Sequence, residues 1–134
     1  MESNRNLDRL PNEDEEMETI DLQLEARALA AREEEITSKM LLKTGDLRLL
    51  LMSLKKGARL REHHADARTS VHVLSGAVRL LTEGKTLELG AGHVTTLEAS
   101  VPHSVEALES SALLLTMAWP KAAELKKMPH RGYS

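Results

Sequence analysis

The feature that most constrains this chain is an alternation of short apolar segments and turn residues that begins after Ile36. Segments of about 5 to 8 residues recur at a spacing of about 8 to 12, which is typical of an all-β sandwich or barrel. The leucine-rich runs are short and flanked by turns, so we expect strands buried on both faces rather than helices. The expected strands cover residues 39–43, 47–54, 59–63, 69–74, 77–82, 85–89, 93–97, 103–107 and 112–119.

The first third of the chain has a different composition. Residues 1–16 are polar and end in an acidic run, which predicts a disordered acidic arm. Residues 17–36 are rich in Leu, Ala, Glu and Arg, with a weak apolar stripe at helical spacing. This pattern predicts an N-terminal α-helix that docks on the body of the protein. Residues 37–119 would then form the barrel, and residues 120–134 a C-terminal tail.

Several classes of protein are excluded by composition. The absence of cysteine excludes disulfide bonds, thiolate metal sites and cysteine nucleophiles. No apolar run approaches the roughly 18 residues that span a bilayer, and the acidic N-terminal stretch does not resemble a secretory signal peptide. We therefore expect a cytoplasmic protein that does not engage membranes.

Charge and aromatic content argue against nucleic-acid binding. Residues 1–36 carry 12 acidic and 4 basic side chains, whereas residues 37–134 carry 9 acidic and 14 basic ones. A mildly basic body with an acidic extension is not the strong basic surface of a DNA-binding protein. Trp119 and Tyr133 are the only aromatic residues, too few to stack several bases.

The histidines and glycines of the β region resemble the two motifs of the cupin superfamily. Gly57-x5-His63, followed by a segment ending in Val-Leu-Ser-Gly76, resembles Gly-x5-His-x-His-x3-4-Glu-x6-Gly. The stretch from Gly92 to Val-Pro-His103 resembles Gly-x5-Pro-x-Gly-x2-His. The resemblance covers roughly residues 38–118. It implies a cupin double-stranded β-helix, that is, a jelly-roll barrel, and such barrels commonly form homodimers.

The resemblance also implies a ligand set, of which this chain retains half. His63 matches the first metal-binding histidine of the family and His103 the last. Ala65 stands at the second histidine position and Thr69 at the glutamate position. The expected pocket therefore holds two imidazoles with Thr69 as a neutral neighbour. Two imidazoles bind a divalent ion such as Fe, Mn, Ni or Zn weakly unless water or a ligand completes the coordination shell.

A second register remains open. His63 and His64 cannot both face inward from a regular strand. A one-residue slip, for example through a β-bulge, would place Glu62 and His64 on the inward face together. With His103 they would form a two-histidine, one-carboxylate set like that of non-haem Fe(II) oxygenases.

The other polar residues of the β region carry weaker predictions. His72 has the opposite strand parity to the pocket residues, so we expect it to face outward, and His93 is expected in a turn. Arg68, Arg79 and Glu98 are candidates for the rim of the barrel, where they would bind a carboxylate or phosphate or simply remain solvated.

Three functional hypotheses follow. The first is a barrel that binds a small polar molecule, with or without a weakly held divalent metal ion, and has no catalytic activity of its own. The second is a metal-dependent enzyme of the dioxygenase or isomerase type, which would use Glu62, His64 and His103, or His63 and His103. The third is a structural, dimeric interaction module. A fold alone does not choose among them.

Overall fold

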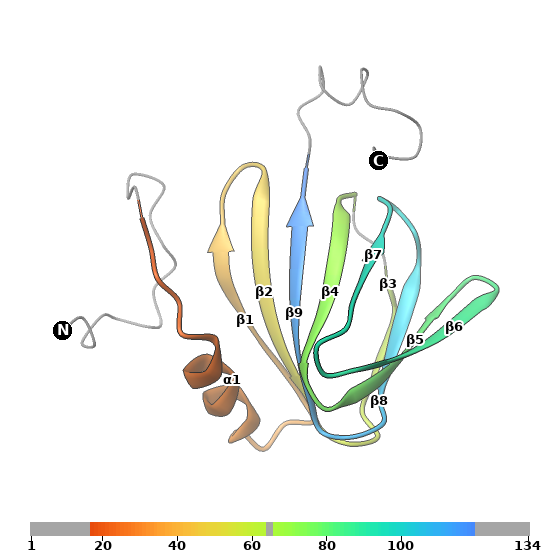
Figure 1. Ribbon diagram of the computed structural model, residues 1–134, viewed down its shortest axis with the longest axis horizontal. Helices are drawn as coiled ribbons and strands as arrows, with labels where there is room; N and C mark the ends of the chain where they lie inside the picture. The colour runs from red at the N-terminus through yellow and green to blue at the C-terminus, as the bar shows by residue number, and fades with distance from the viewer. Residues whose placement is uncertain (1–16, 64–65, 120–134) are drawn as a thin grey trace.

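A computed structural model describes residues 17–63 and 66–119 of the 134-residue chain, with only the backbone for Glu62 and His63. The predicted acidic arm (1–16) and C-terminal tail (120–134) lie outside these residues. The described part contains one helix and two antiparallel sheets that face each other (Figure 1). No helix in it is long and apolar enough to cross a membrane.

The chain passes repeatedly between the two sheets, as in a jelly roll. The larger sheet has the strand order β1-β2-β9-β4-β7 and the smaller one β3-β8-β5-β6. The strands are β1 (Ile36–Lys43), β2 (Leu47–Leu54), β3 (Arg59–His63), β4 (Arg68–Ser75), β5 (Ala77–Thr82), β6 (Lys85–Gly90), β7 (Val94–Leu97), β8 (His103–Ala107) and β9 (Ser111–Ala118).

All nine expected strands are confirmed, and most of their bounds agree to within one residue. Glycines with positive φ stand in the predicted breaks, at positions 57, 76, 84 and 92. Gly76 is the most constrained of them. An added Cβ would overlap the Ser110 carbonyl and the Ser111 side chain, so the β4–β5 turn admits only glycine there.

The N-terminal helix is shorter than the predicted 17–36. Helix α1 spans Leu22–Ala30, and the Asp21 carboxylate caps it by accepting a hydrogen bond from the Leu24 amide at 3.1 Å. The helix ends before the acidic residues 33–35, whose charges would be unfavourable at the negative end of the helix dipole.

Two apolar clusters hold these elements together. The larger fills the space between the sheets and includes Leu54, Val73, Val78, Leu80 and Leu113. The smaller consists of Leu29, Leu41 and Leu51 with partly buried neighbours, and it joins α1 to the outer face of β1 and β2. Figure 1 shows the helix on this side of the larger sheet. Strand β2 is thus buried on both faces over residues 51–54, as its leucine-rich sequence predicts.

Candidate functional site

His103 faces the interior of the barrel at the start of β8. It is 5% exposed, and it is in phase with the buried side chains of Val105 and Ala107 on the same face of β8. Its Nδ1 lies 3.1 Å from the carbonyl oxygen of Val101. Because a carbonyl can only accept, Nδ1 carries the proton in this hydrogen bond, and the lone pair of the neutral ring is then on Nε2. Histidine ligands of metal ions are commonly oriented by a hydrogen bond of this kind.

His63 is paired with His103 across β3 and β8. The Cα partners in this pair are Leu60 with Val105 and then His63 with His103. Three steps along β3 therefore match two along β8, which is a β-bulge with one extra residue in β3. The bulge brings the backbone of His63, rather than that of Glu62, opposite His103.

The choice between the two predicted registers stays a prediction at the level of side chains. The side chains of Glu62 and His63 and the whole of His64 lie outside the described part of the structure. Within the described residues, no group of three or more His, Asp or Glu side chains could hold a metal ion. Among the described residues, one imidazole, that of His103, is buried and could serve as a metal ligand.

Thr69 lies near the start of β4 and faces inward. It is 5% exposed and in phase with the buried Val71 and Val73. Its hydroxyl donates a hydrogen bond to the Ala67 carbonyl at 3.3 Å. Only residues 64–67 connect His63 to β4, so Thr69 lies at the same end of the barrel as the His63–His103 pair.

Arg48 is an interior residue that the sequence analysis missed. It begins the inward row of β2 that continues with Leu50 and Met52, and its Cα partner on β9 is Met117. Met117 is in turn paired with Thr69 on β4, so one row crosses three strands. The guanidinium carbon lies 4.4 Å from the centre of the Trp119 ring. Strand parity gave no clear signal, because positions 47, 49 and 51 in the other phase are leucines as well.

The expectation that Arg79 stands at the barrel rim is wrong. Arg79 lies on the outer face of the smaller sheet, because its neighbours Val78 and Leu80 fill the core. It forms ion pairs with Glu88 at 3.2 Å and with Glu106 at 3.1 Å. The hydrogen bond to Glu88, with a contribution from Glu106, raises the pKa of Arg79 above its ordinary value.

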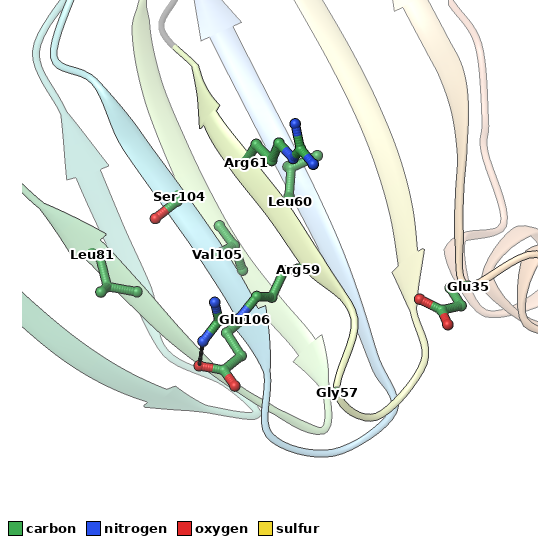
Figure 2. Close-up of a pocket in the computed structure, with 9 residues that line it drawn as sticks. All are labelled: Glu35, Gly57, Arg59, Leu60, Arg61, Leu81, Ser104, Val105 and Glu106. Atoms are coloured by element: carbon green, nitrogen blue, oxygen red, sulfur yellow. Dashed lines mark ion pairs between the residues drawn. The ribbon is translucent and has the colours of Figure 1, made fainter.

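The same outer face carries a hollow of about 620 Å³. Figure 2 shows its lining on β3, β5 and β8, with a dashed line for the ion pair between Arg59 and Glu106 at 3.7 Å. The pair Arg59–Glu106 adjoins the core pair Leu60–Val105 along the two strands, so its side chains point away from the interior. The ion pair of the hollow therefore lies on the face opposite to that of His103, and the core residues Leu60 and Val105 complete the lining from beneath.

The remaining histidine predictions are confirmed. His72 alternates with the buried Val71 and Val73 and thus lies on the outer face of the larger sheet. His93 is exposed in the turn before β7, where its Nδ1 accepts a hydrogen bond from the Gly90 amide at 2.9 Å. Glu98 is exposed, and Arg68 shares the outward parity of His72.

Comparison with known proteins agrees with this architecture. The cupin-domain family Cupin_2 matches residues 50–119. A conserved Streptococcus pyogenes protein of unknown function is 26% identical, with a TM-score of 0.69 over 87% of this chain and 100% of that one. A cupin superfamily protein from Desulfitobacterium hafniense is 20% identical, with a TM-score of 0.69 over 86% of this chain and 99% of that one.

A third solved structure is more similar in sequence over a shorter region. The cupin 2 conserved barrel domain protein from Leptotrichia buccalis is 32% identical, with a TM-score of 0.65, and the match covers 70% of this chain and 46% of that one. The curated protein sequences contain no match. The jelly-roll topology and the family match over more than half of the chain lead to one conclusion: this chain belongs to the Cupin_2 family of cupin-domain proteins.

Proposed function

We propose that this protein binds a small polar molecule inside its barrel, at the end where Thr69 and His103 lie. The observation that carries the proposal is the burial of these two polar side chains on the inward faces of β4 and β8, in phase with apolar core residues. A core of this kind is ordinarily filled by aliphatic side chains, and buried polar groups are retained where they meet polar partners. The binding function requires no catalytic step.

A divalent metal ion is the second part of the proposal. The imidazoles of His103 and His63 would hold it, and water or an oxygen atom of the ligand would complete its coordination. The hydrogen bond from His103 Nδ1 to Val101 favours this assignment, since it leaves the lone pair on Nε2. When bound, the ion would act as a positive centre for an oxygen of the ligand. Two protein ligands predict weak, exchangeable binding.

Metal analysis of protein purified without a histidine tag tests this proposal. The protein is dialysed against Ni²⁺ or Zn²⁺, and the bound metal is measured by mass spectrometry. We expect one exchangeable ion per chain, which is lost in His103→Ala. The variants His72→Ala and His93→Ala remove imidazoles outside the interior and should keep the ion.

Comparison of His63→Ala with His64→Ala then decides between the two registers. Loss of the ion only in His63→Ala supports the pair His63 and His103. Loss only in His64→Ala, with tight stoichiometric metal, favours the set of Glu62, His64 and His103 and thus the metal-dependent enzyme. If His103→Ala binds the same metal as the unmodified protein, the proposed metal site is wrong.

A further inference from the structure

Arg48 is a charged residue in a position that a barrel core normally gives to an apolar one. Its neighbours in the inward row of β2 are Leu50, Met52 and Leu54, which pack in the core between the sheets. The Arg48 Nε atom is buried and has no hydrogen-bond partner among residues 17–63 and 66–119. A buried donor without an acceptor has lost its hydrogen bond to water, and no protein hydrogen bond offsets that cost. The Arg48 Nε–H therefore lacks a hydrogen-bond acceptor, and the described residues do not provide one.

The Arg48 side chain is oriented by a contact with Trp119. Its guanidinium lies over the Trp119 ring, with 4.4 Å between the guanidinium carbon and the ring centre. Trp119 is itself anchored, because its amide donates a hydrogen bond to the Asp46 carbonyl at 2.9 Å. Stacking uses the flat face of a guanidinium and leaves its N–H groups to point outward in the plane. The Nε–H and a neighbouring Nη–H then form a fork that matches the two oxygens of a carboxylate.

The charges around this position also favour an anion. The Cα partner of Arg48 on β1 is Lys43, another cation. Like charges directly opposite each other on neighbouring strands are destabilising. In the described part of the chain neither residue forms an ion pair, and the nearby Asp46 carboxylate accepts a hydrogen bond from the Thr44 hydroxyl at 3.0 Å. A bound carboxylate would offset the repulsion.

We propose that Arg48 binds the carboxylate of the ligand, which makes the ligand a small organic acid. The inference rests on the proposed binding function and adds the ligand's chemical class. Arg48, Met117 and Thr69 are successive partners on β2, β9 and β4. At about 4.8 Å between neighbouring strands, the Cα atoms of Arg48 and Thr69 are about 10 Å apart. An acid of a few carbons spans that distance, with its carboxylate at Arg48 and its polar end toward Thr69.

Trp119 provides the readout, since it is the only tryptophan of the chain. Its fluorescence is followed while lactate, malonate and succinate are added at constant ionic strength. The uncharged amides of the same acids and inorganic phosphate serve as comparison probes. We expect a saturable change with at least one of the three acids and at least a tenfold weaker response to its amide. A rise in the thermal unfolding midpoint with the same acid gives a second measurement that does not depend on tryptophan.

Variants assign the response to Arg48. Arg48→Gln should weaken binding of the acid at least tenfold, and Arg48→Lys, which keeps the charge but loses the planar fork, should weaken it by a smaller factor. Arg48→Met, which replaces a half-buried charge by an apolar chain, should remain folded and also lose binding. The matched control is Arg79→Gln on the outer face, which should bind the acid like the unmodified protein.

The outcomes separate this inference from the function on which it rests. Equal binding by Arg48→Gln, no saturation below about 10 mM for any of the three acids, or a response to phosphate alone overturns the carboxylate assignment. If Arg48→Gln binds the acid as tightly as the unmodified protein but His103→Ala does not bind it, the proposed barrel site is supported and only the carboxylate assignment is wrong. A third outcome is that Arg48→Gln loses binding of the acid while His103→Ala and Thr69→Val both keep it. Arg48 then binds acids at a different place, and the proposed interior site is wrong.

Discussion

In the pair of strands β3 and β8, the Cα atom of His63 is the direct partner of the Cα atom of His103. The two residues are forty positions apart in the sequence, and one extra residue in β3 sets their alignment. Without this bulge, counting from the pair Leu60 and Val105 would have brought Glu62 opposite His103. A bulge that realigns a strand beside a candidate site is a common device in β proteins.

The turn at Gly76 should be intolerant of any side chain. We expect Gly76→Ala to lower the free energy of unfolding by about 2 to 4 kcal/mol, because the new Cβ would meet Ser110 and Ser111 and the residue has a φ of 86°. Gly84→Ala is the matched control: its φ is 75°, but no atom lies within 4 Å of the added Cβ. It should cost about 1 to 2 kcal/mol. Chemical denaturation measures both, and equal losses would show that packing around Gly76 is not the cause.

Docking of the helix should depend on one face of α1. Leu29 is 2% exposed and belongs to the cluster between the helix and the sheet, whereas Leu24 on the same helix is 40% exposed. We expect Leu29→Ala to cost about 2 to 4 kcal/mol in the free energy of unfolding. Leu24→Ala should change it by less than about 0.5 kcal/mol. Urea unfolding followed by circular dichroism tests this difference, and similar effects for both variants would contradict the observed orientation of α1.

The ion pair between Lys39 and Glu25 should couple the helix to β1. Lys39 Nζ lies 2.9 Å from Glu25 Oε1, and the Glu25 side chain is only 6% exposed. Removing the cation in Lys39→Met leaves a buried carboxylate without this partner, which should cost about 2 to 3 kcal/mol. The double variant with Glu25→Gln should lose less than the sum of the two single variants, by about 1 kcal/mol. Additive losses in denaturant unfolding would show that the pair contributes no coupling.

We expect the protein to form a homodimer through the outer face of the larger sheet, beside the part that α1 covers. Val94 on β7 is 54% exposed there and is paired with His72. Burial of such an apolar side chain against a second copy would stabilise a dimer. Light scattering at micromolar concentration should give twice the chain mass of 14.8 kDa, and Val94→Glu should shift it toward the monomer. Thr86→Glu, an exposed position on β6 of the smaller sheet, is the control. A monomeric unmodified protein would contradict the prediction.

The strands were predictable because their signal is local. A short stretch of sequence is enough to show the apolar segments and the turn residues between them. All nine strands occur where this pattern predicts them. The helix was predicted less well. Its apolar stripe indicated helix over 17–36, yet the Asp21 cap and the acidic residues after Ala30 confine it to nine residues.

The candidate site was predictable only in part. His103 and Thr69 were found through their motif positions, and both are buried on inward faces. Arg48 was not predicted, because both phases of its leucine-rich strand are apolar and neither marks the inward face. Arg79 was misplaced, because the burial of Val78 and Leu80 turns it to the outer face. Both errors concern which face of a strand a residue occupies, which depends on the residues buried beside it.

By itself, the sequence determined that this chain is a β barrel preceded by a helix, and which histidines are candidates for a site. The strands and the helix follow from side-chain periodicity and from turn residues, which act over a few neighbours, whereas the candidate histidines follow from the resemblance of their motifs to those of cupins. Only the tertiary structure decided that His63 is aligned with His103 and that Arg48 lies against Trp119. Such relationships join residues far apart in the chain, and they depend on strand register and on one bulge, which the packing of the whole barrel selects.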